Sequence, residues 1–327
     1  MEAFLESFGS KELKKLLREI ILNFPSDDEI EFFKDWFKAR YGENLRAVIF
    51  FGSCLSELSK SPTSFKDFIV IVDKYRLTSK NPLKWLSHWL LPPDLFHLAE
   101  ERQEKKYECK YYIISLKQLL DATSAQAKDL YILGRLSKRI AVIYYRDQEG
   151  LELILDAHVS SIQRANQLSL SLLERFDKAG FIKAVMRLSY LAETRLEDER
   201  KVESLYLAHS EFYKKVYGLI LKELIEKGIV REEGQDNFRV IGAKLPVDKR
   251  KVEEFLVLSR KRFKARWPKM ILTVDNWLEQ LLAKLERTYG IKLEIPAWER
   301  PFILITGWRH YFRFKKEGKI HESKLKE

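Results

Sequence analysis

Residues 47–53 have the sequence AVIFFGS, and residues 67–72 have the sequence DFIVIV. Both runs are short, apolar and rich in β-branched or aromatic side chains, and turn or charged residues bound them, which is typical of buried strands. Residues 111–114 and 140–144 repeat the pattern. Helical periodicity in residues 82–90 and 116–136 separates these runs. The pattern predicts an α/β fold built on one mixed sheet.

The segments on either side of these strands predict helices. Residues 10–42 have the pattern of two amphipathic helices separated at Phe24-Pro25-Ser26, with Ser26 and Asp27 as candidate N-caps. From about residue 155 to beyond 220, apolar residues recur at steps of three and four. Gly228 ends this helical run, and residues 229–231 and 238–241 predict a hairpin. Helices followed by a hairpin indicate a winged-helix-like module.

Length, charge and cysteine content limit the class of protein. The 327 residues include 59 Lys+Arg and 48 Asp+Glu, for a net charge of +11. No uncharged apolar run approaches the ~18–20 residues that a membrane span needs. Cys54 and Cys109 are too few for a disulfide framework, and the acidic opening lacks the features of a signal peptide. We therefore expect a cytoplasmic protein with anionic partners.

Two basic, aromatic blocks lie after residue 258. Residues 259–270 hold six basic residues and no acid, with Phe263 and Trp267 between them. The last 27 residues hold seven basic and three acidic residues, interleaved with Trp308, Phe312 and other aromatics. Such blocks suit an anionic lipid surface, and they equally suit single-stranded nucleic acid or an ordinary solvated surface.

The Gly-Ser turn and the nearby carboxylate are the strongest candidate for chemistry. Gly52 and Ser53 end the first strand, and Asp67 enters the second. This combination is the active-site frame of nucleotidyltransferases: glycine admits a triphosphate to backbone N–H groups, serine donates to phosphate, and the carboxylate holds Mg²⁺. Asp67 is the expected metal ligand. Ile69 stands where a second carboxylate is usual, and Asp73 lies about 20 Å along the strand.

Other catalytic motifs are absent from the sequence. The six histidines never have the spacing of HExxH or a comparable metal site. No GxxxxGK[ST] or GxGxxG phosphate loop occurs, and no GxSxG nucleophile motif occurs.

Several stretches together resemble the mitochondrial translocator assembly and maintenance family, the soluble, mitochondrial-type CTP:phosphatidate cytidylyltransferases, and indicate a bacterial or archaeal-like member. The similarity covers roughly residues 20 to 220, and the order of the stretches is its most specific feature. Four positions depart from the family pattern: Tyr112 and Ala192 replace glycine, Arg139 replaces proline, and Glu193 replaces aspartate. The matching stretches are Phe24-Pro25, residues 48–53, 67–69, 110–115, 130–138 and 188–195, and Lys201-Val202.

The resemblance implies transfer of CMP from CTP to phosphatidic acid, giving CDP-diacylglycerol and pyrophosphate. The acceptor is a phosphomonoester, already largely dianionic at pH 7, so it needs cations more than a general base. Lys110 and Arg135 are the expected catalytic cations, beside Asp67. Lys138, Arg195 and Lys201 are further candidates.

A helical cluster supplies the remaining candidates. Ser189, Tyr190 and Glu193 are spaced to share one face of a helix. Glu193 would be the second carboxylate or a contact to cytosine or ribose, and the alternative is a polar packing cluster. The expected cofactor-binding set is Gly52, Ser53, Ser189, Tyr190, Glu193 and Lys201.

We expect three parts: a nucleotidyltransferase domain (1–155), a helical, winged-helix-like domain (156–250), and a basic, aromatic membrane-docking region (251–327). The expected partners are CTP, phosphatidic acid and, peripherally, the inner face of the cell membrane, without nucleic acid. Two alternatives stay open. The winged-helix pattern and the charge also suit a nucleotidyltransferase that acts on RNA or protein, and the missing second carboxylate also suits an inactive fold that binds nucleic acid or membrane.

Overall fold

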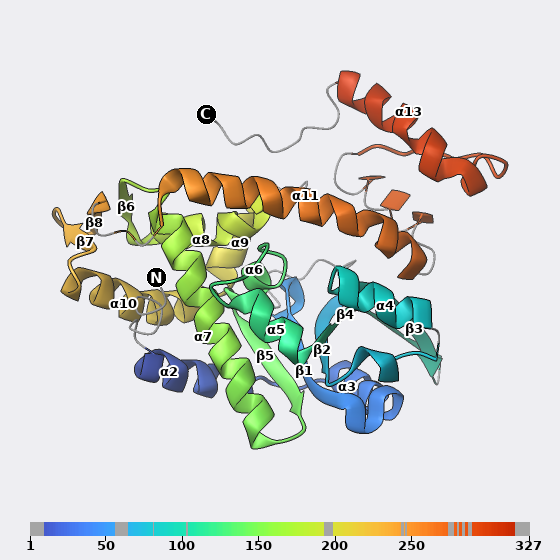
Figure 1. The fold of residues 1–327 in the computed structure, drawn as a ribbon, viewed down its shortest axis with the longest axis horizontal. Coiled ribbons are helices and arrows are strands. Elements are labelled where there is room, and N and C mark those ends of the chain that lie inside the picture. The colour runs from blue at the N-terminus through green and yellow to red at the C-terminus, as the bar shows by residue number, and fades with distance from the viewer. Residues whose placement is uncertain are drawn as a thin grey trace.

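The protein is described from a computed structural model, shown in Figure 1. The described residues are 10–55, 65–80, 82–102, 104–192, 199–242, 245, 247–273, 278–279, 281–282, 285–286 and 290–317.

A five-stranded mixed sheet forms the centre of the N-terminal part, which confirms the predicted α/β class. Its strands are β1 (Leu45–Phe51), β2 (Lys66–Val72), β3 (Asp94–Arg102), β4 (Lys105–Ser115) and β5 (Ile140–Tyr145). The order is β3-β4-β2-β1-β5. β2 and β4 are parallel, and the other neighbours are antiparallel. All four predicted strands are present. β3 was not predicted, because its second half, AEER, is polar where the β3–β4 hairpin extends past β2.

The two predicted N-terminal helices are present, and both pack on the sheet. In α3 (Asp28–Tyr41), the Asp27 side chain accepts from the backbone N–H of Ile30 at 2.8 Å and is the N-cap. The rings of Phe33 and Phe37 lie 5.4 and 5.6 Å from the ring of Phe68 on β2. α2 (Ser10–Leu22) packs against β5 and against α7 (Gln148–Leu170).

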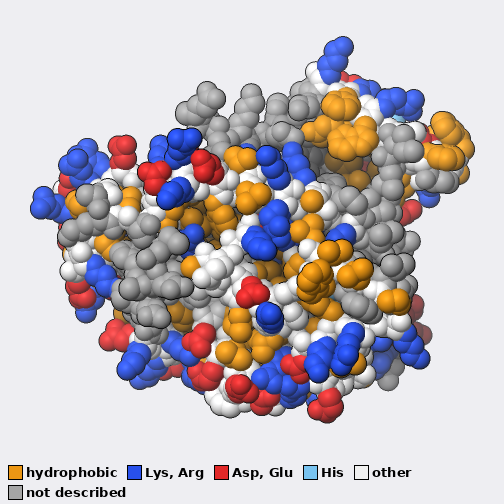
Figure 2. Space-filling view, viewed as in Figure 1, with side chains coloured by type: hydrophobic (Ala, Val, Ile, Leu, Met, Phe, Trp, Pro, Cys, Tyr) orange, Lys and Arg blue, Asp and Glu red, His pale blue; other side chains and the backbone are white. Residues whose placement is uncertain are grey.

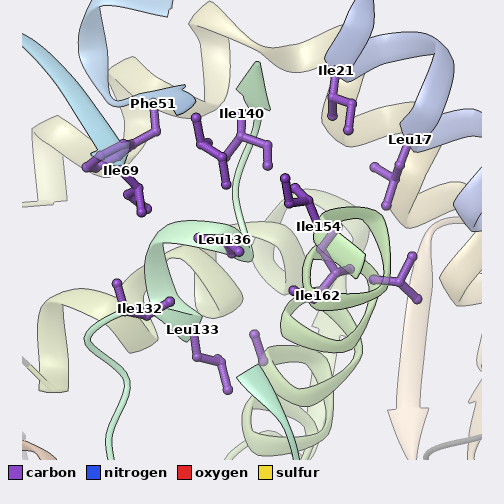
Figure 3. Packing of buried hydrophobic residues seen from close by; sticks show 14 of the residues in the cluster. Leu17, Ile21, Phe51, Ile69, Ile132, Leu133, Leu136, Ile140, Ile154 and Ile162 are labelled. Atoms are coloured by element: carbon purple, nitrogen blue, oxygen red, sulfur yellow. The ribbon is translucent and has the colours of Figure 1, made fainter. Parts of the chain in front are cut away.

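The opposite face of the sheet is covered by α5 (Leu116–Thr123), α6 (Leu133–Leu136) and α7. Figure 3 shows Phe51, Ile69 and Ile140 of the strands packed toward Leu136 of α6 and Ile154 of α7. The helix predicted over 116–136 is thus two helices. The chain between them is held by side chains instead: Asp129 accepts from the Tyr131 N–H, and Ser259 accepts from the Leu130 N–H.

The following part is mainly helical and includes a small sheet. Its elements are β6 (Arg175–Asp177), α8 (Lys178–Ala192), α9 (Glu199–Ala208), α10 (Ser210–Glu226), β7 (Val230–Glu232) and β8 (Asn237–Val240). The predicted hairpin is β7–β8. β6, which was not predicted, adds to β8, so the order is β6-β8-β7. A strand that precedes the helices and pairs with the second strand of a later hairpin gives winged-helix connectivity.

A long helix, α11 (Lys249–Thr273), runs from the small sheet to the region of β3 and α4 (Pro82–Leu90) (Figure 1). It packs on α8 and on β3. After it comes α13 (Ile303–Lys316), where Phe314 is buried with Ile291. No helix in the described parts of the chain has the length and apolar character to cross a membrane. The three-part division stays a prediction.

Candidate active site

Several of the predicted site residues lie at one end of the five-stranded sheet. Because β1 and β2 are antiparallel, the last residue of β1, Phe51, pairs with Asp67 near the start of β2. Because β2 and β4 are parallel, Asp67 also pairs with Lys110. Ile140, the first residue of β5, pairs with Phe51 from the other side. The topology therefore brings together the Gly-Ser turn, Asp67, Lys110 and the residues that precede β5.

Gly52 lies directly against the carboxylate. Its φ is +91°, a region that residues with a side chain rarely adopt. A Cβ built on Gly52 would lie 3.0 Å from Oδ2 of Asp67. The site therefore needs glycine for two reasons, the backbone conformation and the space beside Asp67. Ser53 follows in a short 3-10 turn that ends at Leu55.

Lys110 projects from β4 among aromatic side chains. Its Nζ lies 4.9 Å from the centre of the Phe65 ring. His97 on β3 pairs with Lys110, and its ring lies 5.5 Å from that of Phe65. A cation over an aromatic ring is attracted by the negative face of that ring, which helps to fix its position. Lys110 is thus placed beside Asp67, as the candidate role requires.

Arg135 lies deeper than expected. Its guanidinium sits between the rings of Tyr112, at 5.0 Å, and Tyr131, at 3.9 Å, and it donates to the Tyr131 carbonyl. Tyr112 lies two residues along β4 from Lys110, and its ring is 5.8 Å from that of Phe51. Arg135 is 6% exposed. It therefore adds positive charge beneath the sheet end, and its direct contact with substrate stays a prediction.

Ser189 and Tyr190 reach this region from α8. Ser189 is buried, accepts from Nζ of Lys138 at 2.6 Å and donates to the Met186 carbonyl at 3.0 Å. Nζ of Lys138 also lies 4.6 Å from the Tyr190 ring centre. A Cβ on Gly134 would come within 2.7 Å of the Ser189 Cβ, so glycine permits α6 to approach α8. Ser189 and Tyr190 together hold Lys138 in position.

The other two predicted contacts are less completely placed. Glu193 lies outside the described residues, so its role as a second carboxylate stays a prediction. Lys201 is placed by its backbone, which lies in α9.

One pair near the site was missed by sequence reasoning. Nη1 of Arg139, just before β5, lies 3.1 Å from Nδ1 of buried His209. Burial, and then the charge of Arg139, lower the pKa of His209 to about 4, so the imidazole is neutral and accepts from the guanidinium. In the sequence, Arg139 was visible only as a departure from the family's proline.

The candidate site could hold a magnesium ion through one carboxylate. The described part of the chain contains no group of three or more His, Cys, Asp or Glu side chains that would enclose a metal. Mg²⁺ usually keeps several waters and binds through one or two carboxylates and the substrate's phosphates. Asp67, whose carboxylate lies directly beside Gly52, supplies one such carboxylate. It would hold the ion together with phosphate oxygens.

The basic block at 259–270 is placed differently from the prediction of a docking surface. Arg262 and Arg266 bind Oδ2 of Asp129 at 2.8 and 2.9 Å, and Lys269 pairs with buried Asp94. Burial alone would raise the pKa of Asp129, but the two arginines outweigh it and hold that pKa below its ordinary value. These three cations therefore bind within the protein, and they were mistaken for a lipid-facing block because sequence shows charge without its partner.

The chain is similar in sequence to known proteins. Residues 99–268, just over half of the chain, match the family model described as mitochondrial phosphatidate cytidylyltransferase. The match begins after Gly52 and Asp67, and it ends within α11, at residue 268, beyond the expected limit near 220. A crystal structure of a nucleotidyltransferase-like protein from Exiguobacterium sibiricum 255-15 is similar over 89% of this chain and 92% of that one, at 12% identity and a TM-score of 0.25.

A curated relative supports the same assignment. The chain is 29% identical over 117 residues to the mitochondrial phosphatidate cytidylyltransferase of Bos taurus. The matched segment covers 35% of this chain and 34% of that protein, about a third of its length. With the family model matched over more than half of its residues, the chain belongs to the mitochondrial phosphatidate cytidylyltransferase family.

Proposed function

We propose that the protein transfers CMP from CTP to phosphatidic acid. In this reaction an oxygen of the acceptor's phosphate forms a bond to the α-phosphorus of CTP, the bond from that phosphorus to the β-phosphate oxygen breaks, and pyrophosphate leaves. The observation that carries the proposal is the contact of Gly52 with the Asp67 carboxylate, beside Lys110, in a chain of this family.

The side chains at the sheet end suit the demands of phosphoryl transfer, which are positioning and charge stabilisation. The open backbone at Gly52 and the hydroxyl of Ser53 would hold the triphosphate. Asp67 would bind Mg²⁺, which supplies positive charge against the phosphates. Lys110 lies next to Asp67 and would stabilise the charge on the leaving pyrophosphate.

A phosphatidate acceptor lies in a bilayer, and exposed aromatic side chains offer a way to reach it. On α13, Trp308 and Phe312 are 61% and 60% exposed, one turn apart, with exposed Arg309 and Arg313 beside them. On α4, Trp89 is also exposed. Figure 2 shows hydrophobic side chains gathered over α13 and near α4, with Lys and Arg between them. We propose that this surface docks peripherally on anionic lipid.

The direct test is synthesis of CDP-diacylglycerol from CTP, Mg²⁺ and phosphatidate vesicles. Asp67→Asn should remove the product, since it deletes the charge that binds the metal. Asp73→Asn is the matched control: Asp73 follows the same strand at its far end, where it pairs with Arg146, so this variant should keep its activity. Absence of product with the wild-type protein, or full activity of Asp67→Asn, would overturn the proposal.

A different acceptor, RNA or protein, is favoured by two observations. These are the winged-helix connectivity of β6, β7 and β8 and the net charge of +11. A nucleotidyltransferase that acts on RNA or protein would place label from α-labelled nucleotide on tRNA or on protein. It would show little preference for CTP. Label found only in lipid, and only with CTP, decides for the cytidylyltransferase.

A further inference from the structure

The sheet end carries positive charge on both sides of the Gly52–Asp67 contact. In the order β4-β2-β1-β5, the contact belongs to the two central strands. Lys110 lies on β4, and Lys138 and Arg139 immediately precede Ile140 of β5. Neighbouring strands are about 4.8 Å apart, so the backbones of β4 and β5 are separated by about 14 Å. The two groups of cations therefore lie on opposite flanks of the Gly52–Asp67 contact.

The charge of Arg139 has no carboxylate to balance it. Burial lowers the pKa of Arg139, and within the described part of the chain no carboxylate pairs with its guanidinium. Its contact, His209, is neutral and provides an acceptor without a negative charge. A partly buried cation without a counter-charge costs free energy unless a ligand supplies that charge.

The neighbouring residue adds a second cation that is already oriented. Nζ of Lys138 is held by Ser189 and lies over the ring of Tyr190. Lys138 is thus held by α8, and Arg139 is held by His209, the residue before α10. Both cations lie on the β5 side of the Gly52–Asp67 contact.

We propose that Lys138 and Arg139 form a seat for a phosphate dianion, and that this dianion is the phosphate of the acceptor. Phosphoryl transfer places the attacking and leaving groups roughly in line on opposite sides of the reacting phosphorus. Lys110 lies on the β4 side and, in the proposed function, stabilises the leaving pyrophosphate. The β5 side then receives the attacking phosphate. The assignment to the acceptor rests on the proposed function, whereas the phosphate seat itself rests only on the structure.

Steady-state kinetics with monomeric dioctanoyl phosphatidate test the assignment without interference from membrane docking. Arg139→Gln should raise the KM for phosphatidate about tenfold or more and leave the KM for CTP within about twofold, because a hydrogen bond to a charged group is lost on the acceptor alone. Arg139→Lys should restore part of the affinity, and Lys138→Gln should act in the same direction. Arg146→Gln is the matched control, since Arg146 follows the same strand at its other end and pairs with Asp73.

Binding measured without turnover separates the seat from the reaction. Calorimetry with glycerol 3-phosphate should give binding to the wild type and to Arg146→Gln, and binding at least about tenfold weaker to Arg139→Gln. If calorimetry gives that result but no CDP-diacylglycerol is formed, the phosphate seat is supported and the proposed function is contradicted. A rise in the KM for CTP alone assigns the cations to the triphosphate and overturns the acceptor assignment. Equal binding of glycerol 3-phosphate to both Arg139 forms overturns the seat.

Discussion

A side chain on Gly52 would meet the carboxylate of Asp67, because a Cβ there would lie 3.0 Å from Oδ2. Gly52→Ala should therefore displace Asp67 and also strain the backbone at its φ of +91°. We expect activity to fall on the order of 100-fold, comparable to the loss of one group that stabilises transition-state charge. We expect the free energy of unfolding to fall by about 1–3 kcal/mol, because alanine must adopt an unfavourable φ. Turnover and chemical denaturation measure the two effects.

Gly218→Ala is the control for this prediction. Gly218 lies exposed in α10, and nothing stands within 4 Å of a Cβ built on it. Alanine should stabilise the helix by about 1 kcal/mol and leave turnover unchanged. If Gly52→Ala also kept its turnover, the contact with Asp67 would have no part in the reaction.

The second prediction concerns the buried ion pair between Arg266 of α11 and Asp129. Arg266 also donates to the Pro92 carbonyl at 2.7 Å, and its guanidinium lies 4.6 Å from the Tyr131 ring. Arg266→Met removes one of the two arginines that balance a buried carboxylate. We expect it to lower the free energy of unfolding by about 3 kcal/mol, measured by urea denaturation.

An exposed pair on the same helix provides the comparison. Arg250 pairs with Glu254 at 3.3 Å, and the two side chains are 85% and 66% exposed. Arg250→Met should change the free energy of unfolding by less than about 0.5 kcal/mol, because solvent screens the pair. Equal effects of the two substitutions would mean that Arg266 contributes no more than a surface charge.

Much of the sheet and the site could be predicted from local pattern. The β-branched runs at β1, β2 and β5 gave the strands, and turn chemistry gave Gly52 beside Asp67. Such signals are local: they depend on side-chain type and on spacing within one segment. The pairing of Lys110 with Asp67 followed only once the strand order was known.

The partners of charged residues could not be predicted in the same way. The bonds of Arg262 and Arg266 to Asp129 join positions more than 130 residues apart, and nothing within 259–270 distinguishes a buried cation from an exposed one. Arg139 and His209 likewise meet only through the fold. β3 was missed because edge strands keep polar side chains, and the pattern of apolar residues is then incomplete.

The third prediction is a pH dependence of stability that arises from His158. This residue is fully buried on α7, and its Nδ1 donates to the Leu136 carbonyl at 2.6 Å. Burial lowers its pKa from about 6.5 to about 4. Between pH 4 and pH 6.5, His158 binds a proton in the unfolded chain but not in the folded chain. The free energy of unfolding should therefore decrease as pH falls from about 6.5 to 4.

One histidine with that shift accounts for about 3 kcal/mol over the interval. In His158→Asn, whose amide can donate to the same carbonyl, the free energy of unfolding should vary less with pH by about that amount. His209, whose pKa is also lowered to about 4, supplies the remaining dependence. Urea denaturation at pH 4.5, 5.5 and 7 measures the slopes, and parallel curves for the two proteins would contradict the assignment to His158.

The last prediction tests the docking surface on α13. Trp308 and Phe312 are exposed, whereas Phe314 is buried, so only the first two are able to enter a lipid interface. Burying one aromatic side chain contributes about 1.5–3 kcal/mol, and each Lys or Arg near anionic lipid adds ~1 kcal/mol. Trp308→Ser with Phe312→Ser should therefore weaken binding to phosphatidate-containing vesicles by at least about 100-fold in sedimentation assays.

A control of equal exposure separates lipid contact from general loss of apolar surface. Leu207 is 60% exposed on α9, and Leu207→Ser should leave vesicle binding unchanged. With dioctanoyl phosphatidate in monomeric solution, the α13 double variant should turn over as the wild type does, because its site at the sheet end is intact. Loss of turnover on the monomeric substrate would place α13 in the active site, and unchanged vesicle binding would remove it from the docking surface.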